Sequence, residues 1–174
     1  EAFMDATDQA ESLIGPHMPG MLVIRSLSKT WGLAGLRVGY VVGDPSQIAR
    51  LASAQPAWPV SSPAAVAMVA TSSEEARAEA DRGYAGLPAR RAHLTGALRA
   101  SGFGVVTSHA PFVLIDTTPC GTSSVRPALA AAGFAVRRGE SFPGLGPTWI
   151  RAKVPSTGVA DDLVAALCSL KRAH

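Results

Sequence analysis

Short apolar runs alternate with polar, glycine- and proline-rich segments in the first part of the chain. Two of these runs, residues 21–25 and 37–43, contain β-branched residues and predict two strands, of which the first is expected to be buried. Asp44 and Pro45 follow directly and supply an N-cap and a first-turn proline, which predicts a helix over residues 45–54. The pattern in this part is therefore one of strands followed by helix.

The middle of the chain has a helical pattern. Prolines on both sides of a tryptophan end the first helix and predict an extended loop over residues 55–59. An alanine-rich helix then continues to about residue 72. Residues 74–100 are charged and alanine-rich, and they predict a helix, kinked near Pro88, that connects two structural layers.

Beyond Gly102 the pattern changes to short strands that alternate with helices. The expected strands cover residues 104–108, 112–117, 134–138 and 148–154, and the expected helices cover residues 122–132 and 158–171. This alternation predicts an α/β or α+β fold with a sheet covered on one face.

The length and composition place the chain among globular proteins. It has 174 residues, of which 47% are hydrophobic and 17% are charged, enough to bury a core. No apolar run approaches the length of a membrane span, and no signal peptide is visible, so we expect no membrane partner. The chain begins with Glu1 rather than a methionine, which points to a start upstream of it.

The charge balance is mildly basic, with 16 Lys and Arg against 13 Asp and Glu. This excess suits anionic small molecules as readily as nucleic acid. Because the basic pairs are scattered and lack interleaved aromatic residues, we expect no nucleic-acid partner. These pairs are Arg90-Arg91, Arg137-Arg138 and Lys171-Arg172.

The cysteines and histidines suggest neither disulfides nor metal. Cys120 and Cys168 lie far apart in a chain without secretory features, which favours reduced thiols and a cytoplasmic location. The histidines share no metal-ligand spacing with them or with one another, so no metal site is expected. The histidines are His17, His93, His109 and His174.

The richest stretch in chemistry runs from residue 26 to residue 40. Lys29 follows a strand end and is flanked by apolar side chains, so we expect it to be partly desolvated, with a lowered pKa. A neutral amine is what imine formation with an aldehyde requires. Ser26, Ser28 and Arg37 can bind a phosphate, and the glycines between them allow the backbone to approach a ligand.

The alternative is a solvated loop lysine among ordinary turn glycines. The joint pattern of two serines, the lysine, an aromatic residue and Gly-Leu-x-Gly-x-Arg favours the functional interpretation. The Walker phosphate loop does not compete, because it needs Gly-Lys-Ser/Thr, which is absent.

Residues 26–39 resemble the pyridoxal-phosphate attachment motif of class I/II (fold type I) aminotransferases. The resemblance implies pyridoxal 5'-phosphate as cofactor, with Lys29 forming the imine bond to it. It implies that Ser26, Ser28 and Arg37 contribute to binding the cofactor phosphate. The fold class implied is α/β, comprising the end of the large cofactor-binding domain and a small C-terminal α+β domain.

The first residues resemble another segment of the same family. Glu1 to Asp5 are similar to the continuation of an Asp-Glu-Ala-aromatic segment whose Asp, which pairs with the pyridine nitrogen, would precede Glu1. Phe3 would contact the cofactor where many aminotransferases have a tyrosine, and it has no hydroxyl to donate. In this respect the chain is closer to the threonine-phosphate decarboxylases of cobalamin biosynthesis than to histidinol-phosphate aminotransferases.

Residues 135–151 resemble the C-terminal substrate region of the same subgroup, in which two arginines flank a Phe-Pro-Gly-Leu loop. The resemblance implies that Arg151 binds the substrate carboxylate and that Arg137 binds an anion, the substrate phosphate. Two arginines on neighbouring short strands can clamp a dianion. The alternative is two surface arginines at strand ends. Arg138 is the weaker candidate because alternation along a strand points it away from Arg137.

The implied organisation is the later half of a larger enzyme. Residues 1–72 would end the cofactor-binding domain, residues 73–100 would be the connecting helix, and residues 101–174 would form the small domain. The implied function is that of a homodimeric, pyridoxal-phosphate-dependent lyase acting on a phosphorylated amino acid, threonine phosphate. A histidinol-phosphate-type aminotransferase and a non-catalytic fragment that needs its N-terminal half are the alternatives. We expect these 174 residues alone to be inactive.

Overall fold

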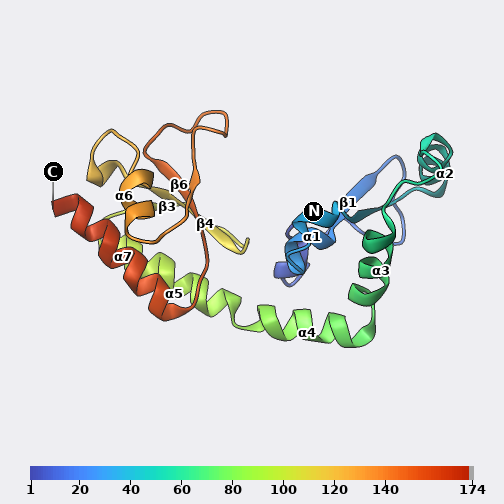
Figure 1. Cartoon of the computed structure of the whole chain (residues 1–174), viewed down its shortest axis with the longest axis horizontal. Helices are drawn as coiled ribbons and strands as arrows, with labels where there is room; N and C mark the ends of the chain where they lie inside the picture. Colours follow the sequence, from blue (N-terminus) through green and yellow to red (C-terminus); the bar gives the residue numbers. More distant parts are fainter. Residues whose placement is uncertain (173–174) are drawn as a thin grey trace. The chain divides into compact units, whose positions relative to one another are not determined.

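The computed structural model describes residues 1–172 and divides the chain into two compact units. The first unit is Glu1–Ala85 and the second begins at Gly86 (Figure 1). Each unit contains its own sheet and helices, and each is described separately below. No helix among the described residues is long and apolar enough to cross a membrane.

An antiparallel hairpin forms the centre of the first unit. Strand β1 (Leu22–Ser26) pairs with β2 (Gly39–Gly43), so that Leu22 lies opposite Gly43 and Ser26 opposite Gly39. The connection contains the short helix α1 (Leu27–Thr30) and the 3-10 helix η2 (Ala34–Leu36).

The second strand of this hairpin begins later than the pattern predicts. Arg37 ends η2 in the left-handed region, with φ of 53°, so the chain becomes extended only at Gly39. Gly39 faces the partner strand closely, because a Cβ there would lie 2.5 Å from the carbonyl oxygen of Arg25. The expected start of the strand at residue 37 is therefore wrong.

Capping explains the helices that follow. Helix α2 (Pro45–Ala54) has the predicted bounds, and Asp44 accepts hydrogen bonds from the backbone amides of Ser46 and Gln47. Helix α3 (Ser62–Thr71) begins after Ser61, whose side chain accepts from the amide of Ala64. A 3-10 turn η1 (Met4–Ala6) lies near the start of the unit.

The long helix expected over residues 74–100 is two helices. Helix α4 (Glu74–Ala85) ends the first unit, and α5 (Leu87–Ala100) begins the second. The break comes at Gly86, directly before α5, and Pro88 occupies the first turn of α5, where a missing amide costs nothing. The proline therefore starts a helix rather than kinking one.

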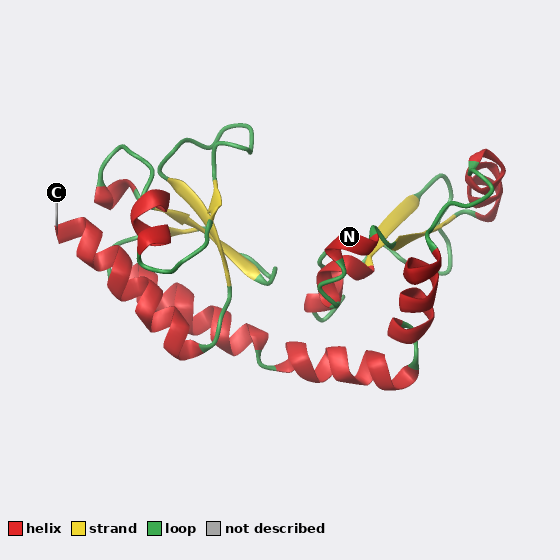
Figure 2. Ribbon diagram, viewed as in Figure 1, coloured by secondary structure: helices red, strands yellow, loops and turns green. Residues whose placement is uncertain are grey.

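The second unit is a four-stranded antiparallel sheet in the order β3-β4-β6-β5, with helices packed against it (Figure 2). Its strands are β3 (Gly104–Val105), β4 (Phe112–Asp116), β5 (Arg137–Arg138) and β6 (Trp149–Lys153). Besides α5, its helical elements are η3 (Thr118–Cys120), α6 (Arg126–Ala131) and α7 (Thr157–Arg172). The outer strands β3 and β5 are much shorter than expected.

Alternation along the two central strands separates a core face from an open face. Val113 and Ile115 of β4 and Ile150 of β6 are buried, together with the helix residues Leu94, Leu98 and Leu167. The intervening strand residues, among them Phe112 and Arg151, are only half-buried. The expected sheet with one covered face is confirmed, and Arg151 lies on the other face.

The core of the first unit is small and lies beneath the 26–40 segment. Leu27, Val38 and Ala64 are buried together, and Leu33, Leu36 and Met68 pack against them. Helix α1 therefore rests on η2, on the start of β2 and on α3.

Candidate cofactor and substrate sites

Lys29 lies on α1, which begins where β1 ends. Leu27 and Ser28 of this helix are buried, whereas Lys29 is exposed. The expected desolvation is wrong for the described residues, because the short helix turns Leu27 and Ser28 inward and Lys29 outward. The Nζ atom of Lys29 lies 5.4 Å from the centre of the Phe3 ring, in cation–π geometry. Lys29 has no hydrogen bond or ion pair within residues 1–172.

The expected phosphate-binding residues lie on the same short segment. The Oγ atoms of Ser26 and Ser28 are hydrogen-bonded at 2.7 Å, and Nη1 of Arg37 donates to the carbonyl of Ala34 at 3.0 Å. Arg37 is exposed, and no carboxylate of the described residues pairs with it. Residues 26–37 thus carry two hydroxyls, a guanidinium and an amine, which are the groups that a phosphorylated aldehyde needs.

In the second unit, the structure brings Arg137 and Arg151 together. They are direct partners across the β5–β6 ladder, whereas Arg138 pairs with Ile150. Like charges directly opposite one another destabilise a sheet, and neither arginine forms an ion pair within the described part of the chain. An anion bound between them would remove this repulsion.

Two aromatic rings hold the Arg151 guanidinium. Its Cζ lies 4.5 Å from the centre of the Phe112 ring and 5.6 Å from that of Phe142. Phe112 lies on the neighbouring strand, where Leu114 is the direct partner of Arg151. The alternation of residues along β4 is enough to predict that Phe112 lies on this face. The position of Phe142 could not be predicted in this way, because it depends on how a long loop folds.

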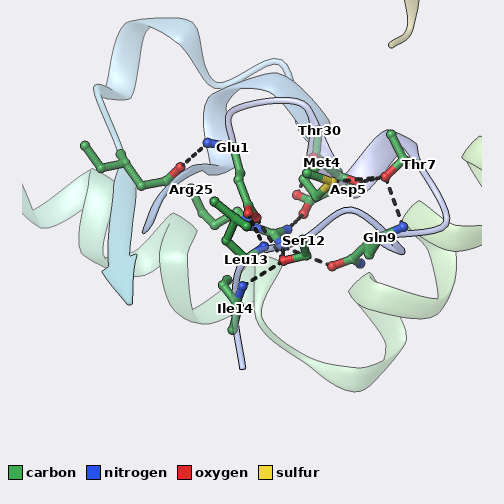
Figure 3. Close-up of polar contacts among 11 residues, drawn as sticks. Glu1, Met4, Asp5, Thr7, Gln9, Ser12, Leu13, Ile14, Arg25 and Thr30 are labelled. Atoms are coloured by element: carbon green, nitrogen blue, oxygen red, sulfur yellow. Dashed lines mark hydrogen bonds and ion pairs between the residues drawn. The ribbon is translucent and has the colours of Figure 1, made fainter. Parts of the chain in front are cut away.

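The first unit contains a buried ionic cluster around Arg25, which the sequence pattern did not predict (Figure 3). The side chain of Arg25 is 5% exposed and lies on the inward face of β1. Its Nε donates to Glu1 at 2.9 Å and its Nη1 donates to Asp5 at 2.7 Å. The remaining partners of Arg25 in the cluster are Gln9 and Ser12, each at 3.1 Å from Nη2. The only sequence signal is a charged residue at an inward position of an otherwise apolar strand.

The pKa of the Glu1 carboxyl reflects this cluster. The backbone amide of Leu13, 2.6 Å from Oε1, is the main cause of a lowered pKa. Hydrogen bonds from Ser12 and Arg25, together with the charge of Arg25, act in the same direction against the effect of desolvation. Glu1 is therefore held in its ionised form.

The cysteines are free thiols, and the described residues contain no cluster of His, Cys, Asp and Glu that could hold a metal ion. Burial raises the pKa of the Cys120 thiol, whose Sγ contacts the carbonyl of Leu167. His174 lies outside the described residues.

The family model for aminotransferase class I and II matches residues 1–168. The chain belongs to this family. The family depends on pyridoxal phosphate, which confirms the expected cofactor. The expected fold, pyridoxal-phosphate-dependent fold type I, is confirmed as well.

The curated relatives of this aminotransferase-family chain include histidinol-phosphate aminotransferases. One from Mycobacterium bovis is 41% identical over 155 residues, which are 88% of this chain and 42% of the relative. Another, from Burkholderia mallei, is 34% identical over 174 residues, or 98% of this chain and 48% of the relative. The chain thus spans less than half the length of these two relatives.

Solved structures of decarboxylases and of an aminotransferase share this fold. A decarboxylase from Sulfurospirillum multivorans has a TM-score of 0.83 at 22% identity, covering 100% of this chain and 47% of that chain. L-threonine-O-3-phosphate decarboxylase from Porphyromonas gingivalis has a TM-score of 0.72 at 20% identity, covering 87% and 46%. A histidinol-phosphate aminotransferase from Sinorhizobium meliloti, in complex with pyridoxal-5'-phosphate, has a TM-score of 0.71 at 24% identity, covering 99% and 48%. At these identities the likeness concerns the fold alone.

Proposed function

We propose that the protein is a pyridoxal-phosphate-dependent enzyme that decarboxylates a phosphorylated amino acid, threonine phosphate. The observation that carries the substrate class is the pair of arginines, Arg137 and Arg151, directly opposite each other without a carboxylate partner in the described chain. Threonine phosphate carries two anionic groups, one for each guanidinium. Arg151 would bind the carboxylate and Arg137 the phosphate, each through the planar fork of its guanidinium.

Lys29, Ser26, Ser28 and Arg37 are the residues that would hold the cofactor. When bound, pyridoxal phosphate supplies an electron-accepting ring that stabilises negative charge on the substrate carbon. The amine of Lys29 is exposed and unpaired within the described residues, so it is available both for attachment and for proton transfer. In decarboxylation the bond to the carboxylate breaks and carbon dioxide leaves. Lys29, released when the substrate amine takes its place and protonated by the substrate's ammonium group, would then deliver this proton to the carbon that lost the carboxylate.

The aromatic contacts of Arg151 support a positioning role for this side chain in the reaction. Phe112 and Phe142 help to hold the guanidinium in place, because both rings lie within cation–π distance of Cζ. A carboxylate bound to a fixed guanidinium has a fixed direction. That direction decides which bond at the substrate carbon is broken.

The second candidate is transamination of histidinol phosphate. It is favoured by the name and the 41% identity of the mycobacterial relative. Histidinol phosphate carries the phosphate but no carboxylate, so this substrate would use only one of the two arginines. The non-catalytic fragment is the third candidate, and the unpaired Lys29 and arginine pair speak against it.

Product analysis on the intact protein, as expressed from its own gene, separates these candidates. With added pyridoxal phosphate and threonine phosphate, we expect release of carbon dioxide. Formation of a keto acid from threonine phosphate without carbon dioxide would overturn the decarboxylase proposal. Conversion of histidinol phosphate in the presence of 2-oxoglutarate would instead support the aminotransferase, and no turnover of either substrate would support the inert fragment.

The proposal extends to the assembly state, because the resemblance to fold type I enzymes implies a homodimer. We expect sedimentation equilibrium of the intact protein to give twice the mass of one chain. A single-chain mass across the concentration range would contradict this part of the proposal.

A further inference from the structure

The Arg25 cluster brings one guanidinium and two carboxylates together at buried and partly buried positions of the first unit. Arg25 is 5% exposed, and its carboxylate partners Glu1 and Asp5 are 10% and 33% exposed. Burial of charged groups is costly unless they are paired and hydrogen-bonded, as they are here. No buried side-chain nitrogen or oxygen among the described residues lacks a partner.

One arm of the cluster reaches the helix that carries Lys29. Asp5 binds Arg25 through Oδ1, and its second oxygen, Oδ2, accepts a hydrogen bond from Oγ1 of Thr30 at 2.9 Å. Thr30 is the last residue of α1 and the direct neighbour of Lys29. Figure 3 shows Thr30, Asp5 and Arg25 in this order along the dashed contacts. The end of a four-residue helix is thereby tied to a buried cation.

The other arm reaches the ring beneath Lys29. Glu1 and Asp5 both bind Arg25, and Phe3 lies between them in the sequence. The ring of Phe3 is the group over which Nζ of Lys29 lies, at 5.4 Å. The same guanidinium therefore holds the segment that supplies the ring and, through Asp5, the helix that supplies the amine.

We propose that Arg25 is a positioning residue that seats Lys29 on the Phe3 ring, acting through Glu1 on one side and through Asp5 and Thr30 on the other. This inference rests on the proposed function, in which Lys29 holds the cofactor. Gln9 and Ser12, which belong to the 7–14 segment, accept the remaining hydrogen bonds of the Arg25 guanidinium. Arg25 itself touches neither the lysine nor, in this proposal, the substrate.

The decisive variant is Thr30→Val, which removes one hydrogen bond and leaves the Arg25 ion pairs in place. Thr118→Val is the matched control, because Oγ1 of Thr118 also donates to an aspartate, Asp116, but in the second unit. The readout is the acetylation rate of Lys29 in the cofactor-free protein, measured by peptide mass spectrometry. Lys153 and Lys171 serve as internal references.

Loss of the contact with the Phe3 ring releases the Nζ atom of Lys29 from its place over the ring, so the amine becomes more accessible to the acetylating reagent. We expect Thr30→Val to raise the acetylation rate of Lys29 roughly two- to fivefold, the size of an exposed cation–π contact. Thr118→Val leaves the rate unchanged. Phe3→Leu gives the same rise, and the double variant Phe3→Leu/Thr30→Val shows no further rise, because both substitutions remove one contact.

A purely structural role makes a different prediction. It lowers the melting temperature and leaves the rate at Lys29 unchanged, or it makes the two substitutions additive, and either result overturns the inference. Borohydride trapping of the wild-type protein with pyridoxal phosphate separates the two levels of the proposal. If Lys29 is not trapped, the proposed function fails. If Lys29 is trapped and Thr30→Val behaves as wild type in acetylation, only the positioning role fails.

Discussion

At the scale of single residues, the guanidinium of Arg151 contacts two aromatic rings. The two rings differ in origin, since Phe112 belongs to a strand and Phe142 to the loop between β5 and β6. A loop residue can be changed without disturbing the ladder, which makes Phe142 the better probe of the contact.

We expect Phe142→Leu to raise KM for the phosphorylated substrate roughly two- to fivefold, because Arg151 loses one of its cation–π contacts and is held less firmly. The free energy of unfolding should change little, because Phe142 is only half-buried. Steady-state kinetics measures the effect. Phe134→Leu, another half-buried phenylalanine of the second unit, is the control. An unchanged KM in Phe142→Leu would show that the ring plays no part in binding.

Glu1 provides a prediction about pH. Its folded-state pKa lies below the ordinary value of 4.5, so its contribution to stability is fully present above pH 4.5 and is lost as the pH falls through the folded-state pKa. Glu1→Gln removes this contribution. The difference in free energy of unfolding between wild type and Glu1→Gln should therefore be constant above pH 4.5 and shrink below it.

Urea unfolding of the intact protein between pH 3 and 7 measures this difference, with pH values set at roughly unit intervals across the range in which carboxyl groups titrate. Glu11→Gln, a change at an exposed carboxylate, is the control. A difference that stays constant down to the acid end of the range would mean that Glu1 is not held ionised by Leu13, Ser12 and Arg25.

Which site residues could be predicted depends on how far apart they lie in the sequence. Ser26, Ser28 and Lys29 belong to one contiguous segment, so their chemistry could be recognised together, and their roles stay predictions. The partners of Arg25 could not be predicted, because their contacts span up to 24 positions and depend on how the 1–14 segment folds back onto β1. The exposure of Lys29 is likewise a property of the helix orientation and not of its apolar neighbours.

At the scale of elements, local capping decides where the helices begin. Ser61 is a clear case, because its Oγ accepts from the amide of Ala64 at 3.3 Å at the start of α3. We expect Ser61→Ala to lower the free energy of unfolding of the intact protein by about 1 kcal/mol. Chemical denaturation measures this. Ser62→Ala, at the first position of the helix, should cost less because no capping bond is lost, and an equal cost in both variants would contradict the assignment of Ser61 as the cap.

Elements with local signals were predictable, and elements set by tertiary contacts were not. The bounds of α2 are confirmed because a cap and a proline mark its start. The strand expected from residue 37 begins late because Arg37 adopts a left-handed conformation that nothing in its residue type indicates. Strands β3 and β5 are short because each leaves its ladder after two residues, although the neighbouring strands β4 and β6 continue beyond the paired positions.

At the scale of the whole molecule, the candidate residues fall into two units. The proposed cofactor residues lie in the unit Glu1–Ala85, and Arg137 and Arg151 lie in the unit that begins at Gly86. The α/β character could be predicted from the alternation of strands and helices, and the family from the motif in residues 26–39. The chain spans 42% of the length of its mycobacterial relative, so its function is proposed for the whole protein. This proposal depends on the role of the Lys29 amine.

The measurement that tests this account most directly is borohydride reduction of the intact protein incubated with pyridoxal phosphate, followed by peptide mass spectrometry. Lys29, Lys153 and Lys171 lie far apart in this chain, so peptide mass spectrometry distinguishes modification at each of them. We predict a pyridoxyl group on the Lys29 peptide, absent in Lys29→Ala. An unmodified Lys29, or equal modification of all three lysines, would contradict the central claim.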